Sequence, residues 1–314
     1  MINNPLQTWL AEFFARETLR ANSLIITVYG DAIAPHGGVA GLSSLIKLME
    51  PFGLNARMVR TSVFRLSKED WLSVEQVGRK SFYGLTQSGL RRIEHATHRI
   101  YDQANHQWQG DWNLVLLGDN ALDKKQHAFL RSELLWQGYG LIAPGVLARP
   151  DAEVKTLIEI LDDAKATDKI VALKAQSLSA INHQPLMKLV RQCWNLEAVE
   201  HHYQYFLRQF TPLLRLLKKS SALEAQDYFL ARTILIHEYR RVMLRDPQLP
   251  PQLLPKNWHG GQARELAKNI YMLTLEGSEE HLISVLEARR GKLPKAAPYL
   301  FRRFGGVPGG RKSR

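Results

Sequence analysis

A mixed α+β protein with several domains is the fold class that the sequence predicts, on three observations. The chain has 314 residues, enough for two or three domains of ordinary size. The first third alternates short helical patterns with a basic hairpin, strand and helix patterns then alternate up to about residue 178, and helical patterns return after residue 182. We therefore expect domains at 1–105, 106–181 and 182–314.

The composition restricts the class of protein. Hydrophobic residues make up 45% of the chain and the mean hydropathy is −0.25, which excludes a wholly disordered or fibrous chain. The N-terminus lacks the basic and apolar regions of a secretory signal, and no apolar run is long enough to span a bilayer. The single cysteine, Cys193, fits a reducing compartment. We expect a soluble cytoplasmic protein without a membrane partner.

The net charge of +12 makes nucleic acid the first partner to consider. The C-terminal stretch 289–314 contains nine basic residues and no acidic one, so it holds most of the excess. A second basic region, 57–99, has nine basic residues against four acidic residues. The two basic regions need not have the same cause.

The first third of the chain has the pattern of three helices, a hairpin and a further helix. These elements are expected at 24–33, 42–49, 56–68, 71–85 and 86–101. Asn55 and Thr86 are suitable N-cap residues for the third and fourth helices, while Pro51 and Gly53 end the second. The hairpin turns at 78–80, where two of the three residues are basic. This order of elements is that of a winged helix-turn-helix domain.

The third helix has an apolar face and a cationic face when its residues are placed at intervals of about 100°. The apolar face carries Met58, Val59, Ser62, Val63 and Leu66, and the opposite face carries Arg57, Arg60, Thr61, Phe64 and Lys68, with Arg65 at the flank. A helix of this kind fits the major groove of DNA, where Arg pairs with guanine and Thr meets a base edge or a thymine methyl group. Phe64 is the unexpected member of the cationic face, and we expect it to pack against the second helix or the hairpin.

These observations predict a duplex DNA interface on the third helix and the hairpin. Arg57, Arg60 and Thr61 occupy the N-terminal half of the helix, which such helices usually present to bases. Basic residues at the hairpin tip suit phosphate contacts, which fix register without reading much sequence. The candidate DNA-binding residues are Arg57, Arg60, Thr61, Arg65, Lys68, Arg79 and Lys80. The alternative, a solvated basic helix face, does not account for the basic hairpin that follows it.

The middle of the chain shows strands and helices in turn. Its expected elements are strand 112–117, helix 123–137, extended run 140–148, helix 151–164 and strand 169–174. This order suggests a ferredoxin-like α+β sandwich, in which a sheet edge or the face opposite the helices would serve dimerisation. Asp119 follows the first strand, where a nuclease of related fold holds a metal ion, but a single carboxylate there is usually a turn residue. Catalysis is not expected.

Helical patterns fill the C-terminal part. They lie at 185–195, 196–210, 212–220, 225–244 and 261–275, with a proline-rich interruption at 246–255. His201, His202, His237 and His259 lack the spacing of a zinc site, and Cys193 lies within a helix without a recognisable histidine partner. We expect no metal ion, no catalytic residue and no cofactor.

Motifs of high combined specificity are spread over nearly the whole chain. They are Arg57–Leu66, Trp71–Leu72, Gly78–Tyr83, Trp136–Gly140, His237–Arg241, Asp246–Pro247, Leu249–Pro250, Leu253–Pro255, Trp258 and Phe301–Gly306. Together they resemble the PaaX family, whose members repress phenylacetic acid catabolism in bacteria. The resemblance implies a dimeric repressor that leaves its operator on binding the aryl-CoA thioester phenylacetyl-CoA, and a middle domain similar to a ferredoxin-like CRISPR-associated endonuclease fold. Residues 307–314 depart from the family pattern.

The effector implied by this resemblance needs an apolar slot for its aryl group and cations for its phosphates. Candidate effector-binding residues are Tyr203, His237, Tyr239, Arg240, Arg241 and Trp258. The alternative, which we favour, is that the aromatic residues are core and the arginines pair with Glu238 and Asp246.

The sequence thus predicts a regulator rather than an enzyme: a dimer that binds double-stranded operator DNA, represses aromatic acid catabolic genes and is released by an aryl-CoA thioester. Two alternatives stay open. One is a metal-dependent nuclease that acts through the middle domain, and the other is a module that binds RNA or a protein partner.

Overall fold

Two compact units make up the chain. The computed structural model describes residues 5–102, 108–118, 122–177, 179–219, 223–289 and 291–306, with the backbone alone at 179–183. Unit 1 contains 1–103, 204–243 and 261–314, and unit 2 contains 104–203 and 244–260. The first and last parts of the chain therefore fold together in unit 1, and the three domain ranges expected from the sequence stay a prediction.

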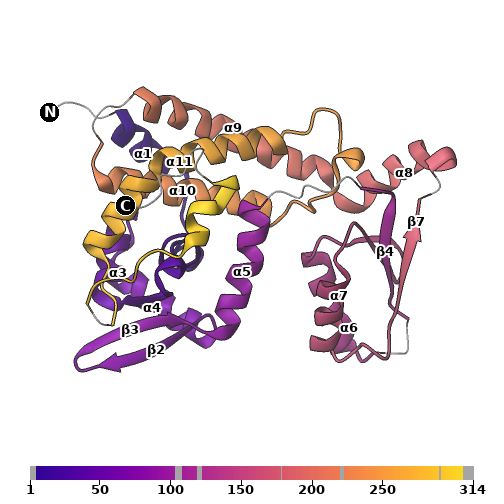
Figure 1. Cartoon of the computed structure of the whole chain (residues 1–314), viewed down its shortest axis with the longest axis horizontal. Helices are drawn as coiled ribbons and strands as arrows, with labels where there is room; N and C mark the ends of the chain where they lie inside the picture. Colours follow the sequence, from indigo (N-terminus) through magenta and orange to yellow (C-terminus); the bar gives the residue numbers. More distant parts are fainter. Residues whose placement is uncertain are drawn as a thin grey trace. The chain divides into compact units, whose positions relative to one another are not determined.

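Helices and a small antiparallel sheet form the N-terminal part of unit 1 (Figure 1). The helices are α1 (Pro5–Arg16), α2 (Ala21–Val28), α3 (Leu42–Met49), α4 (Ala56–Lys68) and α5 (Gln87–Tyr101), and the strands are β1 (Val39–Gly41), β2 (Leu72–Val77) and β3 (Lys80–Leu85). The strand order is β1-β3-β2, with β2 and β3 as a hairpin. The predicted second, third and fourth helices and the hairpin are confirmed as elements, while α1 and β1 were not predicted. The first predicted helix ends at Val28 and continues as a π-helical turn, Tyr29–Ile33.

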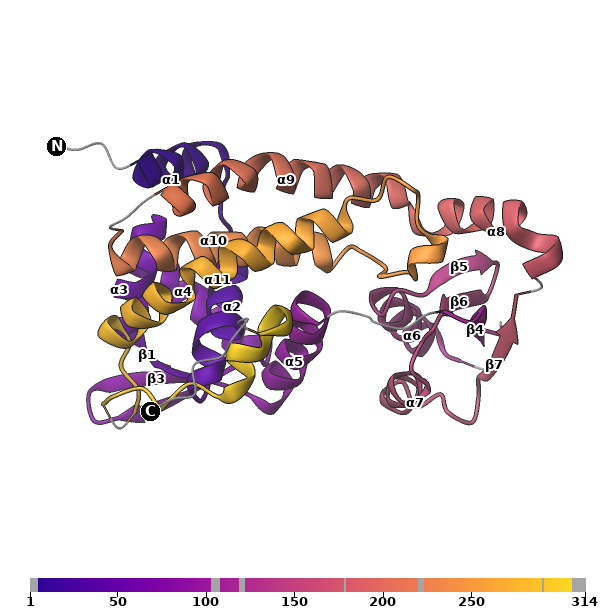
Figure 2. The same ribbon diagram turned by 45° about the horizontal axis from the view of Figure 1, so that its top comes forward.

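The C-terminal helices of unit 1 pack on this N-terminal part. They are the end of α9 (Leu196–Lys219), α10 (Ala225–Met243), α11 (Gly260–Val285) and the 3-10 helix η5 (Pro298–Gly305). Helix α10 contacts α1, α2 and α5, and Figure 2 shows it above α2. Helix α9 runs through Pro212, where the sequence predicted two helices. Burial of Phe210 and Leu213 on either side of the proline offsets its cost, which is about 3 kcal/mol in a helix interior.

Unit 2 contains a four-stranded antiparallel sheet in the ferredoxin-like order. Its elements are β4 (Asp111–Leu116), α6 (Lys124–Trp136), β5 (Gly140–Ala143), β6 (Val146–Pro150), α7 (Val154–Asp163), β7 (Val171–Gln176), α8 (Ser179–Trp194) and the 3-10 turn η4 (Pro251–Leu253). The strand order is β5-β6-β4-β7, so the predicted sandwich is confirmed. The extended run 140–148 is two strands, because the chain turns at Gly145 with φ 71°. A Cβ there would lie 2.9 Å from the Leu117 carbonyl oxygen, so the turn requires glycine.

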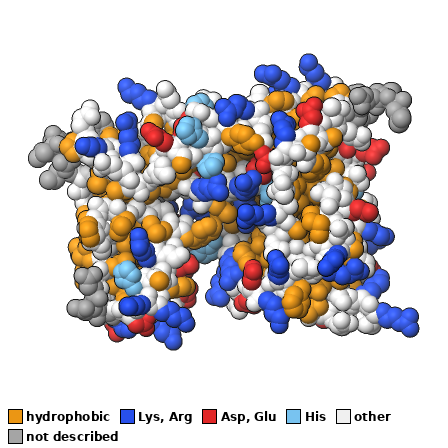
Figure 3. Space-filling view, turned by 180° about the vertical axis from the view of Figure 1, so that it is seen from behind, with side chains coloured by type: hydrophobic (Ala, Val, Ile, Leu, Met, Phe, Trp, Pro, Cys, Tyr) orange, Lys and Arg blue, Asp and Glu red, His pale blue; other side chains and the backbone are white. Residues whose placement is uncertain are grey.

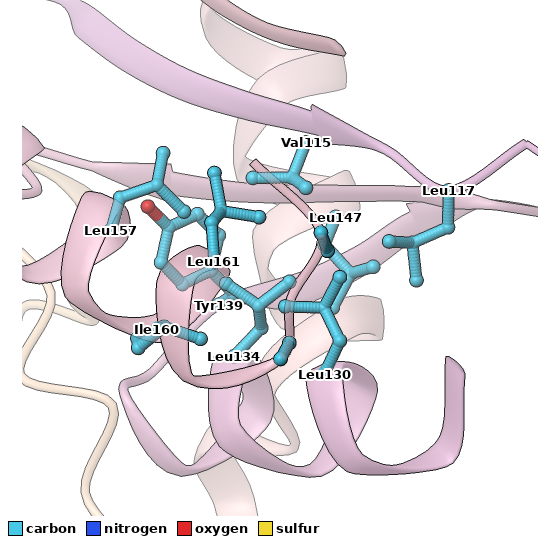
Figure 4. Packing of buried hydrophobic residues seen from close by; sticks show 11 residues of the cluster. Val115, Leu117, Leu130, Leu134, Tyr139, Leu147, Leu157, Ile160 and Leu161 are labelled. Carbon is cyan, nitrogen blue, oxygen red and sulfur yellow. The ribbon is translucent and has the colours of Figure 1, made fainter. Parts of the chain in front are cut away.

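Apolar side chains cover both faces of this sheet. Figure 4 shows Val115, Leu117 and Leu147 of the sheet facing Leu130 and Leu161 of helices α6 and α7. On the other face, α8 and the stretch around η4 pack against the sheet through Val190, Trp194, Leu249 and Leu253. The face opposite α6 and α7 is therefore partly occupied within the chain, and edge strand β7 is left with Val171 and Leu173 exposed.

Two kinds of feature are missing from the part of the chain just described. No described helix is both long enough and apolar enough to cross a membrane. No described cluster of three or more His, Cys, Asp or Glu side chains is arranged to hold a metal ion. Asp119, the residue of the nuclease alternative, lies outside the described residues.

Candidate nucleic-acid interface

Helix α4 is fixed at its start by a side-chain cap and along one side by packing. The carboxamide oxygen of Asn55 accepts a hydrogen bond from the backbone N–H of Met58 at 3.0 Å, as the sequence predicted. The helix buries Val59, Val63 and Leu66, and it contacts both α2 and α3. Because this side faces the core of unit 1, the opposite side of α4 faces solvent.

The solvent face of α4 is cationic. Arg57, Arg60, Thr61, Arg65 and Lys68 are all exposed. Among the residues that the structure describes, none forms an ion pair or hydrogen bond with the guanidinium groups of Arg57, Arg60 or Arg65. Figure 3 shows Lys and Arg side chains near the end of the hairpin, which lies at the lower right in this view. Long cationic side chains without internal partners suit phosphate oxygens and guanine edges.

Two apolar residues of α4 are more exposed than the sequence predicted. Phe64 is 61% exposed and Met58 is 39% exposed, so the expectation that both would pack is wrong. No element that the structure describes covers the outer side of the helix at these positions. Instead, the ammonium group of Lys68 lies 5.5 Å from the centroid of the Phe64 ring. An exposed aromatic ring on a cationic helix face is available to a thymine methyl group.

The hairpin presents basic residues at its end. Gly78 has φ 61°, the positive value that the first residue of a two-residue type II′ turn needs, and Arg79 is the second turn residue. Lys80 begins β3 and pairs in register with Val77. Its ammonium group lies 2.6 Å from Glu287, but both side chains are well exposed, so the pair contributes only about 0.2–1 kcal/mol. Lys80 therefore remains available to a phosphate.

Hydrogen bonds at the base of the hairpin fix it relative to α4 and α5. The backbone N–H of Trp71 donates to the Leu66 carbonyl in the last turns of α4 at 2.9 Å. The hydroxyl of Thr86 donates to the Asp70 carbonyl at 2.7 Å and accepts from the N–H of Gly89 at 2.9 Å, which caps α5 as predicted. A Cβ at Gly89 would lie 2.3 Å from the Trp71 carbonyl oxygen, so this close approach requires glycine. The hairpin and α4 are thus held in one geometry, as a recognition surface requires.

A buried ion-pair cluster ties this part of the molecule to the C-terminal helices. The carboxylate of Asp31, which follows α2, accepts hydrogen bonds from Arg232 of α10 and Arg303 of η5, each at 2.9 Å. The hydroxyl of Tyr101 at the end of α5 donates to the same carboxylate at 2.6 Å. The hydroxyl of Tyr271 accepts from both arginines at 3.0 Å. Arg303 is one of the nine basic residues of 289–314, and its burial removes it from any surface.

Two of the six effector candidates lie in unit 2. The rings of Tyr203 and Trp258 meet edge to face with their centroids 5.4 Å apart. Tyr203 is fully buried, and its hydroxyl donates to the carboxylate of Asp246. The two aromatic residues are therefore in contact with each other, in the manner of core residues.

The other four candidates lie on α10 in unit 1. Tyr239 is buried, and Arg241 is paired with Glu238 at 2.8 Å. His237 is buried, and its Nδ1 lies 3.0 Å from the Thr27 hydroxyl. Burial, together with nearby Arg240 and Arg241, lowers the pKa of His237 to about 3, so the imidazole is neutral.

Arg240 borders a pocket between α2, α5 and α10. The pocket is partly open to solvent, and its walls include Ile26, Ile93, Ile100 and Ile236. The guanidinium group of Arg240 donates to the Thr27 hydroxyl at 3.2 Å and to the Ser23 carbonyl at 3.4 Å. Within the described ranges, no carboxylate pairs with Arg240. A largely buried cation with only neutral partners beside apolar walls suits an apolar ligand that carries an acceptor or a negative charge.

Known proteins are similar to this chain along its length. The family models that match are PaaX-like protein at residues 20–89, PaaX protein central Cas2-like domain at 105–187 and PaaX-like protein C-terminal domain at 194–284. The chain is 37% identical over 305 residues to the transcriptional repressor PaaX of Escherichia coli (strain K12), which covers 97% of this chain and 96% of that protein.

A solved structure is similar in fold as well. An uncharacterized protein from Mycobacterium tuberculosis aligns with a TM-score of 0.53 at 20% identity, over 83% of this chain and 97% of that one. At this identity the similarity concerns the fold alone.

Proposed function

The chain belongs to the PaaX family of transcriptional repressors, and on that premise we propose that it represses phenylacetate-type aromatic acid catabolic genes by binding operator DNA. In this proposal, α2, α3 and α4 with the hairpin β2–β3 are a winged helix-turn-helix domain. The observation that carries the proposal is the set of exposed cations on α4 beside a basic hairpin, of which Arg57, Arg60 and Arg65 form no ion pair within the described residues. The relative's name indicates a regulator rather than an enzyme.

The seven candidate residues take two roles. Arg57, Arg60 and Thr61, in the first half of α4, read base edges in the major groove. Arg65, Lys68, Arg79 and Lys80 contact phosphates and fix the register of the helix on the duplex.

A homodimer fits this role, because two copies present two recognition helices to a two-fold symmetric operator. Strand β7 of unit 2 supports a dimer contact. It is an edge strand, and Val171 and Leu173 on it are 54% and 48% exposed. An exposed apolar edge strand is a surface that a second copy would cover.

The effector in this proposal is an aryl-CoA thioester such as phenylacetyl-CoA, with no resident cofactor, in a cytoplasmic protein. The pocket beside Arg240 supports binding of the acyl group, since its walls are mostly apolar and the partners of Arg240 among the described residues are neutral. The pocket is formed by α2, which packs on α4, and by α5, which follows the hairpin. A ligand that prefers the DNA-incompetent arrangement a hundredfold shifts the equilibrium by about 2.7 kcal/mol. The remaining candidates stay secondary in this proposal: Tyr203, His237 and Tyr239 are buried, Arg241 is paired with Glu238, and Trp258 is half-buried against Tyr203.

A gel shift on the DNA upstream of the protein's own gene tests the proposal. We expect a discrete complex at concentrations at which random duplex is free, and its loss on addition of phenylacetyl-CoA but not of free CoA. Preferential binding of structured RNA would favour the RNA-binding alternative. Magnesium-dependent cleavage that Asp119→Ala abolishes would favour the nuclease.

The variant Ile93→Trp, which fills the pocket, tests the location of the effector. We expect it to bind operator normally and to resist release by phenylacetyl-CoA. The matched control is Ile158→Trp on α7 of unit 2, where the isoleucine is already 47% exposed. Equal release of both variants from operator by phenylacetyl-CoA would exclude this pocket as the effector site.

A further inference from the structure

The chain between α11 and η5, described at residues 286–289 and 291–297, runs beside the hairpin and β1, and we call it the C-terminal segment. The N–H of Gly41 in β1 donates to the Glu287 carbonyl at 2.9 Å, and the N–H of Glu287 donates to the hydroxyl of Ser44 in α3 at 3.0 Å. Further along, Nδ1 of His36 lies 2.7 Å from the Pro294 carbonyl oxygen. Figure 2 shows this stretch, drawn in yellow, beside β1 and β3. The C-terminal segment is thus part of the same surface as the hairpin.

Two ion pairs connect the C-terminal segment to the hairpin itself. Glu287 lies 2.6 Å from the ammonium group of Lys80, and Arg289 lies 2.5 Å from the carboxylate of Glu75 in β2. A Cβ at Gly84 of β3 would lie 3.8 Å from the Arg289 guanidinium group, which places this cation against the hairpin. The carboxylate of the C-terminal segment is therefore neutralised by a cation of the hairpin, and the carboxylate of the hairpin by a cation of the segment.

Further cations of the C-terminal segment have no such partner. Lys292 and Lys295 are exposed, and neither forms an ion pair with any residue that the structure describes. The segment thereby extends exposed positive charge from the hairpin towards the loop before β1, where Pro294 contacts His36 and Ala297 contacts Pro35. Positive charge continuous with a DNA-binding surface lowers the potential energy of a passing phosphate chain.

We propose that the C-terminal segment is a third part of the DNA-contacting surface, in which Lys292 and Lys295 bind backbone phosphates beyond those bound by the hairpin. The inference rests on the proposed function, because it takes α4 and the hairpin as the DNA-binding elements. Exposed lysines suit phosphate contacts, whereas a protein interface is depleted in lysine at its centre. These contacts add affinity without selecting sequence.

A salt titration of DNA binding tests the proposal, with fluorescence anisotropy on operator and on random duplex. The variant Lys292→Gln with Lys295→Gln removes the two cations, and Lys218→Gln with Lys219→Gln is the matched control. Lys218 and Lys219 are exposed at the end of α9, on the side of unit 1 opposite the hairpin in Figures 1 and 2. Each phosphate contact contributes about 0.9 to the slope of log K against log salt.

For the Lys292 and Lys295 variant, we expect the slope to become shallower by about 1–2 and the affinity to fall several-fold, equally on both DNAs. The control should keep the wild-type slope. Equal slopes for the two variants would overturn the inference. A loss of affinity on operator alone would also overturn it, because the lysines would then read bases.

Glu287→Gln supplies an independent measurement. It keeps the backbone hydrogen bonds of residue 287 and removes the charge that faces Lys80, so we expect binding about twofold to threefold tighter with a steeper salt slope. Weaker or unchanged binding would contradict a phosphate contact beside Glu287. Wild-type binding that depends on Arg57 and Arg60, with DNA binding unchanged in the Lys292 and Lys295 variant and in Glu287→Gln, would mean that this inference alone fails. If the wild-type chain does not bind duplex DNA, the proposed function itself fails.

Discussion

The carboxylate of Asp31 is the point where α2 is joined to the C-terminal helices, and Asp31→Asn removes its charge while keeping its shape. Arg232 and Arg303 each lie 2.9 Å from this carboxylate, and all three side chains are almost completely buried. Breaking a buried ion pair by removing one partner costs about 3–5 kcal/mol. Arg232 keeps its second partner, Glu279, at 2.8 Å, so we expect the lower end of that range.

Native-state amide hydrogen exchange on the whole chain measures this loss where it occurs. A loss of about 3 kcal/mol corresponds to exchange roughly 150-fold faster for the protected amides of α2 and α10. Amides of β4 in unit 2 serve as the internal reference and should not change.

Glu159→Gln is the matched control variant. Glu159 lies 4.0 Å from Lys155 in an exposed pair, which is worth at most about 1 kcal/mol. If Asp31→Asn changes the exchange of α2 and α10 by less than about fivefold, the Asp31 cluster does not hold unit 1 together and the reasoning is refuted.

Three further predictions concern the hairpin, the last residues and a buried histidine. Arg79→Ala with Lys80→Ala should make the salt dependence of DNA binding shallower by about 1–2 in slope, and an unchanged slope would remove the hairpin from the interface. Deletion of 307–314 should leave the preference for operator over random duplex intact, whereas a lost preference would show that these residues take part in readout. Because burial first, and Arg240 next, lower the pKa of His237 to about 3, its neutral form stabilises the fold fully above about pH 6.5, and this contribution is lost as the pH falls. Between pH 7 and pH 5, wild type should therefore lose about 2 kcal/mol of stability that His237→Gln does not lose, and parallel losses in chemical denaturation would contradict this.

Local signals explain what the sequence predicted correctly. The cap at Asn55 and the apolar spacing of α4 determine that helix within a few turns, and the glycine at 78 determines the hairpin turn. The alternation of strands and helices between 108 and 178 likewise specifies the sandwich. The unpredicted α1 had a readable signal too, since Leu6, Trp9, Leu10 and Phe13 recur at helical spacing and are all buried.

Contacts between distant parts of the chain determine the features that could not be predicted from the sequence. Phe64 was expected to pack, but whether a neighbour reaches it depends on the positions of other elements. Arg303 belongs to a basic stretch of the sequence, and only its contact with Asp31, 272 residues away, shows that it is buried. The effector candidates were chosen by residue type, and the burial of Tyr203 and Tyr239 agrees with the favoured alternative that the aromatic residues are core.

The most direct test of the central claim compares operator and random duplex for the variants Arg57→Ala and Arg60→Ala. Both side chains are exposed in the first half of α4, so neither truncation should affect folding. If α4 reads bases, each variant should weaken operator binding by about 1–3 kcal/mol and bind random duplex with nearly wild-type affinity. Equal losses on the two DNAs would reduce both residues to phosphate contacts, and no loss on either would contradict the account.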